Sequence, residues 1–264
     1  MFDAHAHLQD DRLKTHLPEV LKYGHEEHIT GISCCATSPS DWHSVKDIDR
    51  RYNSKKLVIV PAYGVHPWYV EGLQPDWPGE LEDYLGNKLV ASVGEIGLDG
   101  IRKSVPRKIQ IKVLQTQLEM ALRLERSVIL HGARAWGELV ERVTPFASRL
   151  PSIIVHGFSG SSEIMKRFVE MGAYISIAGS VCNPKASRVR EAAVQIPDGQ
   201  LLIETDSPDL FPYGGTPAAL DEKNRPLNQP GNLKLICDEV ADLRGVSPEV
   251  IADITASNAR MAFL

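Results

Sequence analysis

Short apolar runs recur along the whole chain, and their regular spacing constrains the fold more than any other feature. Each run ends in polar residues, and a stretch with helical periodicity separates it from the next. Successive runs start roughly 21 to 37 residues apart, which is the length of a βα unit. The runs are FDAHAH (2–7), ITGISCCAT (29–37), LVIVPAYGVHP (57–67), VASVGEIGLD (90–99), SVILHGA (127–133), SIIVHGFSG (152–160), AYISIAGS (173–180) and LLIETDSP (201–208).

The segments between the runs carry apolar residues at helical spacing. Clear examples are residues 108–125, KIQIKVLQTQLEMALRLE, and residues 161–172, SSEIMKRFVEMG. The tail predicts two more helices, and the second of them begins with Ser247 at the N-cap and Pro248 at the first position. Strand-like runs that alternate with helices predict an α/β protein, either a (β/α)8 TIM barrel or a doubly wound open sheet.

The positions of the polar residues decide between these two folds. Histidines and carboxylates stand at the carboxyl ends of the first, third, fourth, fifth, sixth and eighth runs. An open sheet gathers its ligands at one crevice, whereas a barrel lets many strand ends converge on one mouth. The sequence therefore favours a (β/α)8 TIM barrel, with residues 1–264 as a single domain.

The net charge and the cysteines indicate the class of protein and the cellular compartment. The formal net charge is −5 over 264 residues. This charge excludes a strongly basic protein that coats nucleic acid, but it does not exclude a nucleic-acid substrate. We find no signal peptide, and no apolar run reaches the roughly 18–20 residues of a membrane span. The four cysteines form no CxxC motif, so we expect reduced thiols in a cytoplasmic protein.

The chain begins MFDAHAHLQD, in which Asp3, His5 and His7 alternate with apolar residues. Residues two apart on a strand share a face, so we expect these three side chains to point together into the barrel mouth. Two imidazoles on one face can hold one cation. The alternative is that they are polar residues of a frayed N-terminus.

Two pairs of carboxylates follow later strands. Glu95 and Asp99 lie in VGEIGLD, where the flanking glycines allow close backbone approach, and a glutamate there has two oxygens to share between two metals. Glu204 and Asp206 close the last run in LLIETDSP and share one face. For Glu95 the alternative is a solvated acid in a turn at the end of the strand. For Asp206 the alternative is an Asp-Ser-Pro turn in which its side chain caps the next segment.

Two histidines end consecutive runs at matching positions, His131 after SVIL and His156 after SIIV. A single histidine at a strand end is more often a hydrogen-bonded rim residue, but two in matching positions favour a shared site. The strand ends together supply imidazoles and carboxylates at one end of one barrel. Such a mixture suits Zn²⁺, Mn²⁺, Fe²⁺ or Ni²⁺, whereas carboxylate and water alone would suit Mg²⁺ better.

Six motifs follow one another along the chain. They are FDAHAH (2–7), GVHP (64–67), GEIGLD (94–99), SVILHGAR (127–134), HGFSG (156–160) and LLIETDSP (201–208). In order and spacing they resemble the motifs of the TatD-related metal-dependent deoxyribonucleases, and HGFSG with NPKAS (183–187) is most similar to the YjjV-like branch. The resemblance continues through the tail, and it implies an amidohydrolase-like TIM barrel that hydrolyses phosphodiesters with divalent cations.

The resemblance also implies two metal sites that share a residue. The ligands of one metal would be His5, His7, Glu95 and Asp206, and those of the other would be Glu95, His131 and His156. Glu95 would therefore bridge the two metals. Glu95 and Asp206 are the implied catalytic residues, and Asp206 would orient the attacking water and take its proton.

Further residues have implied roles around the metals. His66, Arg134 and Glu204 resemble residues that bind the substrate or support the site. Asp3 resembles a partner that fixes the tautomer of a histidine ring. Trp68 follows His66 and Pro67 at the expected mouth, so it is the tryptophan best placed to stack on a terminal base.

Some features depart from the family or stand outside its motifs. Gly132 and Gly157 replace the Ser or Cys of many members without removing a ligand, and Asn228 begins the expected Asn-x-Pro. We expect substrate preference to depend on the long loop 207–230. A basic group that could hold phosphates, or lie on a solvated helix start, is Arg102, Lys103, Arg107 and Lys108.

The resemblance predicts a deoxyribonuclease of the 3′–5′ exonuclease type with two divalent cations, which would be Mg²⁺, Mn²⁺ or Zn²⁺. We expect single-stranded DNA or DNA ends as substrate, with no membrane and no obligate protein partner. The acidic net charge fits this substrate, because an enzyme that acts at strand ends needs a narrower contact than a protein that binds duplex DNA.

The alternative functions are an esterase, lactonase or amidohydrolase, a D-aminoacyl-tRNA deacylase, and a non-enzymatic metal-binding platform. Glu95 disfavours amidohydrolases that use a carboxylated lysine, and the complete ligand set disfavours the platform.

Overall fold

Eight parallel strands form one sheet in the order β1 to β8 in the computed structural model, which describes residues 1–86 and 90–264. The strands are β1 (Phe2–Ala6), β2 (Gly31–Cys35), β3 (Val58–Tyr63), β4 (Ser92–Gly97), β5 (Val128–His131), β6 (Ile153–Val155), β7 (Tyr174–Ile177) and β8 (Leu201–Ile203). Each strand lies within one of the apolar runs. The predicted barrel is therefore confirmed, and the open-sheet alternative is wrong.

The last strand returns to the first and closes the sheet. Ala6 forms a parallel bridge with Ser207. The His7 N–H donates to the Ser207 carbonyl oxygen at 2.6 Å, and the Asp206 N–H donates to the His5 carbonyl oxygen at 2.9 Å. These bonds lie at the carboxyl ends of β1 and β8, so closing the barrel also brings candidate ligands from both ends of the chain together.

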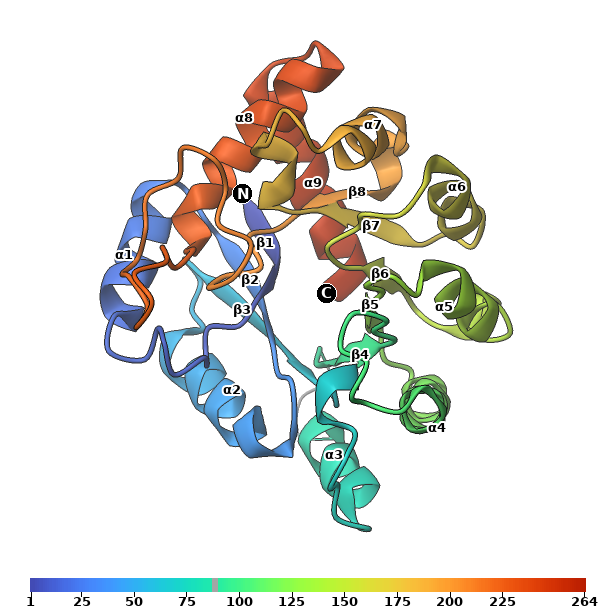
Figure 1. Ribbon diagram of the computed structural model, residues 1–264. Coiled ribbons are helices and arrows are strands. Elements are labelled where there is room, and N and C mark those ends of the chain that lie inside the picture. Colours follow the sequence, from blue (N-terminus) through green and yellow to red (C-terminus); the bar gives the residue numbers. More distant parts are fainter. Residues whose placement is uncertain (87–89) are drawn as a thin grey trace.

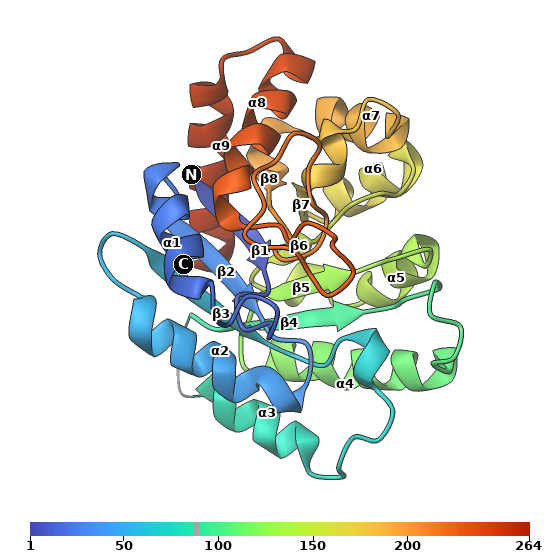
Figure 2. The same ribbon diagram turned by 60° about the vertical axis from the view of Figure 1, so that its left-hand side comes forward.

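Helices surround the strands on all sides that Figures 1 and 2 show. They are α1 (Leu17–Glu26), α2 (Pro39–Tyr52), α3 (Trp77–Gly86), α4 (Arg107–Arg123), α5 (Trp136–Val143), α6 (Ser162–Glu170), α7 (Ser187–Gln195), α8 (Leu233–Arg244) and α9 (Pro248–Phe263). Short 3₁₀ turns are η1 (Pro67–Tyr69), η2 (Ala147–Arg149), η3 (Gly179–Cys182), η4 (Asp198–Gln200) and η5 (Pro230–Asn232). Both predicted tail helices are confirmed as α8 and α9. Ser247 stands at the N-cap of α9, although its hydroxyl does not cap the backbone there.

Apolar side chains fill the space between the strands and the helices. Ile32 and Leu130 on strands belong to the same buried cluster as Trp42 of α2 and Leu139 of α5. This packing is the main favourable contribution to folding, because it removes large apolar surfaces from water. It holds the carboxyl ends of the strands in fixed positions around the mouth.

The C-terminal helix α9 packs against β1 and β8 (Figure 2). The ring of Phe263 stacks on the ring of Phe2 with centroids 5.7 Å apart. The first strand is therefore held by α9 as well as by its two neighbouring strands. None of the described helices is long and apolar enough to cross a membrane, and the four cysteines are free thiols.

Two strands are irregular where a candidate ligand stands. The register of β1 against β2 shifts between Asp3 and Ala6, and that of β4 against β5 shifts between Val93 and Ile96. His5 and Glu95 lie inside these two intervals. Such irregularities turn side chains away from the regular alternation and are frequent next to functional sites.

Candidate metal centre

The carboxyl ends of β1, β4 and β8 bring four ligand atoms to one point. The Nε2 atoms of His5 and His7 are 3.2 Å apart. Glu95 Oε2 lies 3.3 Å from His5 Nε2 and 3.4 Å from His7 Nε2. Asp206 Oδ1 lies 3.6 Å and 3.5 Å from the same two nitrogens. Ligand atoms that surround one cation tetrahedrally at ~2.1 Å are about 3.4 Å apart, so this donor set fits a transition-metal ion.

The other oxygen of Glu95 faces a second group of imidazoles. Glu95 Oε1 lies 2.7 Å from His131 Nδ1 and 3.5 Å from His156 Nε2. It also lies 3.4 Å from His66 Nε2. One buried carboxylate thus has one oxygen in each group, which is the arrangement that a bridging ligand needs.

The charges in this centre depend on one another. Burial raises the pKa of the Glu95 carboxyl, but the imidazoles of His66, His156 and His5 outweigh burial and hold it well below its usual value. Burial lowers the pKa of His5 and lowers that of His66 to about 4. Burial also acts on His7, but the neighbouring carboxylates outweigh it and raise the pKa well above the usual value. A cation would supply the positive charge that a proton supplies on His7.

Three of the rings have a second partner that fixes their orientation. The Nδ1 atom of His7 lies 2.7 Å from the carbonyl oxygen of Cys35. His156 Nδ1 lies 2.7 Å from Glu204 Oε1, and His131 Nε2 lies 3.0 Å from Asp99 Oδ2. When the outer nitrogen of each ring donates to these oxygens, the inner nitrogen keeps its lone pair for a metal.

Asp3 does not orient a histidine ring, so that prediction is wrong. Its carboxylate accepts from the Thr205 N–H at 2.8 Å, the Thr205 hydroxyl at 2.5 Å and the His5 backbone N–H at 3.3 Å. Asp3 therefore ties β1 to the end of β8. Thr205 gave no signal in the sequence except its place between Glu204 and Asp206. The Nδ1 atom of His5 is buried and has no hydrogen-bond partner among the described residues.

A cavity of about 640 Å³ opens over this centre at the barrel mouth. Its lining includes the candidate ligands His7, Glu95, His131, His156 and Asp206, the rim residues Asp10, Asp11, Arg12, Asp41 and Asp209, and His66, Trp68 and Tyr69. The cavity thus joins the imidazoles and carboxylates to solvent. It is large enough for a substrate of several heavy atoms to reach them.

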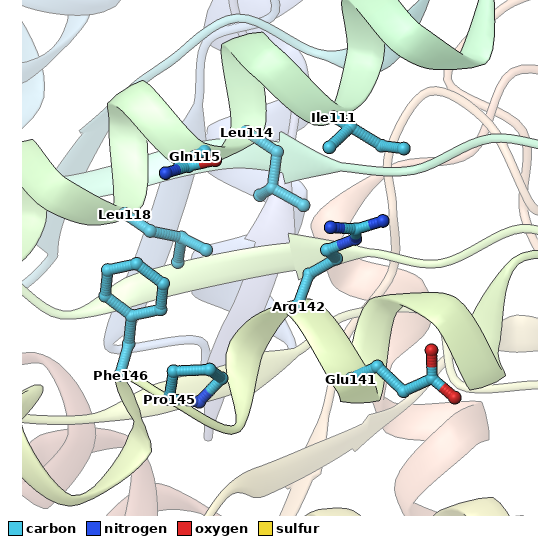
Figure 3. A pocket seen from close by; sticks show the side chains of 8 residues that line it. All are labelled: Ile111, Leu114, Gln115, Leu118, Glu141, Arg142, Pro145 and Phe146. Atoms are coloured by element: carbon cyan, nitrogen blue, oxygen red, sulfur yellow. The ribbon is translucent and has the colours of Figure 1, made fainter.

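A smaller groove of about 290 Å³ lies between α4 and α5, on the outside of the barrel (Figure 3). Aliphatic side chains of α4 line it on one side, and Arg142, Pro145 and Phe146 line it on the other. It contains none of the histidine and carboxylate groups that could hold a metal in the part of the chain that the structure describes. The mouth is therefore the better candidate for chemistry.

The residues expected near the substrate lie in three different settings. His66 is buried, lines the cavity and contacts Glu95. Glu204 is fully buried behind His156, and its Oε1 also accepts from the Gly157 N–H at 2.7 Å, so it supports the site from below. Arg134 is exposed and does not line the cavity.

Comparisons with known proteins agree with this geometry. The sequence model of a family described as TatD related DNase matches residues 2–264. The chain is 28% identical to an uncharacterized metal-dependent hydrolase, YabD, of Bacillus subtilis, over all of this chain and 98% of that protein. It is 30% identical to a 3′-5′ ssDNA/RNA exonuclease, TatD, of Erwinia billingiae, over all of this chain and 98% of that protein. The crystal structure of YJJV, a TatD homolog of Escherichia coli, superposes with a TM-score of 0.89 at 27% identity, over all of this chain and 97% of that one.

Proposed function

The chain belongs to the TatD-related DNase family and is a metal-dependent hydrolase, and we propose from this that it degrades single-stranded DNA from the 3′ end. One observation supports the proposal most directly. The two oxygens of Glu95 face two separate imidazole groups under one open cavity. A pair of cations held in this way suits the hydrolysis of phosphodiesters.

We propose the following ligands for two divalent cations. His5, His7 and Asp206 would hold the first, His131 and His156 would hold the second, and Glu95 would be shared by both. Bound divalent cations make water more acidic and polarise a phosphoryl oxygen. We propose Mg²⁺, Mn²⁺ or Zn²⁺ as the ions, and the imidazole-rich donor set favours Mn²⁺ or Zn²⁺ over Mg²⁺.

His66 has a different task, which follows from its hydrogen bonds. Its Nδ1 accepts from the Trp68 backbone N–H at 3.1 Å. A ring nitrogen that accepts carries no proton, so the proton of this ring is on Nε2, next to Glu95. His66 therefore has its N–H beside Glu95 on the wall of the cavity, and we propose that this N–H binds a phosphoryl oxygen of the substrate.

The remaining residues divide between proton transfer and support. Asp206 is mostly buried at the edge of the cavity, and it orients the attacking water and accepts its proton. Glu204 holds His156 in place. Arg134 follows His131 by three residues on the exposed rim, where it binds a phosphate outside the cavity.

The proposal is tested with Glu95→Gln and Asp206→Asn, with metal content measured beside activity on 3′-labelled single-stranded DNA. We expect Glu95→Gln to lose bound metal and activity, and Asp206→Asn to lose about 10²–10⁴-fold in kcat because a general base is removed. Asp242→Asn is the control, since this exposed residue of α8 lies outside the cavity. Retained phosphodiesterase activity in both variants would refute the assignment.

The bond that is cleaved is tested with parallel substrates. We expect wild-type protein to release nucleotides from single-stranded DNA faster than it hydrolyses p-nitrophenyl esters or D-aminoacyl-tRNA. Faster hydrolysis of either ester would instead favour the esterase or deacylase alternative on the same metal centre. Two predictions are not tested by these experiments, namely that residues 1–264 form a single domain and that the protein is cytoplasmic.

A further inference from the structure

The rim of the mouth cavity is divided into two chemically different arcs. The first arc follows β1, β2 and β8, and it carries the carboxylates of Asp10, Asp11, Asp41 and Asp209. Arg12 is the cation of this arc, and it forms ion pairs at 2.8 Å with both Asp10 and Asp209. The carboxylates outnumber the guanidinium, so this arc repels a polyanion.

The second arc follows β3 and β4, and it is aromatic and basic. Trp68 and Tyr69 are 39% and 44% exposed, although both line the cavity. Arg102 and Lys103 are exposed in the loop after β4, and the Arg102 guanidinium lies over the ring of Trp68. A nucleic-acid strand that leaves the metal centre is therefore attracted over this arc and repelled from the other.

The indole of Trp68 is held in one orientation despite its exposure. Its ring makes T-shaped contacts with the rings of His66 and His131, with centroids 5.0 Å and 6.5 Å apart. The guanidinium carbon of Arg102 lies over the indole, 5.7 Å from the ring centroid. A large aromatic side chain that is fixed at its edges but open to solvent is preorganised to stack.

We propose that Trp68 is the platform on which the terminal nucleobase of a single strand stacks, and that the Arg102 guanidinium, which lies over the indole without a strand, moves aside to bind the phosphate of that nucleotide. The inference rests on the proposed nuclease function and assigns the residues that position its substrate. Because every base has an aromatic face, this platform accepts any sequence. The distance between Arg102 and the indole is short enough for one nucleotide to contact both.

The platform also contacts the second imidazole group. Asp99 Oδ2 lies 3.0 Å from His131 Nε2, and Asp99 Oδ1 accepts the backbone N–H of Arg102 at 2.8 Å. One carboxylate thus fixes both a candidate metal ligand and the backbone of Arg102, whose guanidinium lies over the stacking ring. Stacking on Trp68 therefore sets the distance from the terminal base to the reacting phosphate.

The test compares two decathymidylates, one with a normal 3′ nucleotide and one with an abasic 3′ residue. For the wild-type protein we expect the abasic end to raise KM about tenfold with little change in kcat. Trp68→Ala should raise KM for the normal strand to the abasic value and leave the abasic KM unchanged, and Trp68→Phe should restore most of the difference. Arg102→Ala should raise KM for both strands, and KM of this variant should depend less on salt concentration than KM of the wild type.

Arg149→Ala is the matched control, because its guanidinium also lies over an aromatic ring, that of Phe146, 6.0 Å from the centroid. This pair is outside the mouth cavity, next to the groove of Figure 3. We expect Arg149→Ala to leave KM unchanged for both strands. If Trp68→Ala changes KM equally for the two strands, or for neither, the platform is overturned. A thermal melt of each variant shows whether the variant is folded.

Binding separates this inference from the proposed function. The same strands are titrated into the protein while tryptophan fluorescence is recorded, and we expect base-dependent quenching that Trp68→Phe abolishes. If neither strand is cleaved but this quenching is present, the nuclease proposal fails and the platform stands. If the strands are cleaved but quenching does not depend on the terminal base, the platform fails alone.

Discussion

Glu204 shows how one buried side chain can determine what a neighbouring residue does. It is fully buried, and its Oε1 receives both His156 Nδ1 and the Gly157 N–H. With Nδ1 bonded in this way, His156 is left with Nε2 toward Glu95. The carboxylate thus fixes the tautomer and also makes the ring a stronger ligand.

Replacing Glu204 should therefore weaken metal binding without disturbing the substrate cavity. For Glu204→Gln we expect about 10–100-fold weaker Zn²⁺ binding, because the neutral amide polarises the His156 ring less than the carboxylate does. The measurement is a titration of the metal-free protein with Zn²⁺. Glu222→Gln, which removes the same charge from an exposed loop position, should bind Zn²⁺ like the wild type. Unchanged affinity in Glu204→Gln would show that the contact with His156 is only structural.

At this scale the sequence predicts the inner residues of the centre better than their supports. His5 and His7 share a face because a strand alternates every two residues, so local spacing is enough to pair them. The partner of His156 is 48 residues away in the chain, and no local pattern reports such a contact. The predicted role of Asp3 was wrong for the same reason, since its actual partner, Thr205, is 202 residues away.

At the scale of the elements, the approach of β4 to β5 depends on a residue without a side chain. Gly97 has a φ of +154°, and a Cβ there would lie 2.0 Å from the carbonyl oxygen of His131. The backbone of β5 would have to move, and it carries His131 with it. The close approach of these strands is thus coupled to the position of a candidate ligand.

We expect Gly97→Ala to lower the free energy of unfolding by about 3 kcal/mol, from overpacking and an unfavourable φ together. Urea unfolding of the metal-free protein measures this change. Gly137→Ala is the control, because Gly137 lies in α5 with nothing within 4 Å of an added Cβ. It should raise stability by up to about 1 kcal/mol, the helix preference of alanine over glycine. Equal midpoints for the two variants would contradict the argument.

The first strand is both a structural element and a source of ligands, and two variants separate these roles. Deleting residues 1–7 removes β1, its pairing with β2 and the ring of Phe2 that stacks on Phe263. We expect this deletion to abolish both activity and cooperative unfolding. The double substitution His5→Ala/His7→Ala keeps the strand, so it should unfold cooperatively while lacking activity. Circular dichroism during heating distinguishes the two outcomes, and a cooperative transition in the deletion would contradict the structural role of β1.

The elements themselves are predictable to a useful degree, and their irregularities are not. Each apolar run contains one strand, because a strand buried on both faces needs a continuous apolar segment. The register shifts in β1 and β4 depend on neighbouring strands. They therefore could not be read from either segment alone, although they lie at His5 and Glu95.

For the whole molecule, closing the barrel and assembling the metal centre are one event. The bonds that join β1 to β8 lie between residues 5–7 and 206–207, which include three proposed ligands. Convergence of many strand ends on one mouth is what the sequence predicted from the order of its polar residues. Part of the rim was also predicted, namely Trp68 at the mouth and the basic group that includes Arg102 and Lys103. The acidic arc was not predicted, because its carboxylates come from loops whose arrangement only the closed barrel defines.

Because the ligands come from both ends of the chain, removing metal should destabilise the whole protein. A cation that binds only the folded state at 100 times its Kd adds ~2.7 kcal/mol, which is roughly 5–10 °C in Tm for a chain of this size. We expect EDTA to lower Tm by this amount at pH 7.5 and excess Zn²⁺ or Mn²⁺ to restore it.

Acidity should reduce the same effect, since an imidazole binds metal only without its proton. The carboxylates around His7 raise its pKa well above the usual value despite burial, so a proton already competes with metal on this ring at pH 7.5 and competes more strongly as the pH falls. The difference in Tm with and without EDTA is therefore expected to shrink between pH 7.5 and pH 5.5. His5→Ala/His7→Ala serves as the control and should show a smaller EDTA effect at both pH values. A Tm of the wild type that does not respond to EDTA at pH 7.5 would mean that the barrel closes independently of its metals, and the coupling of fold and site would then be wrong.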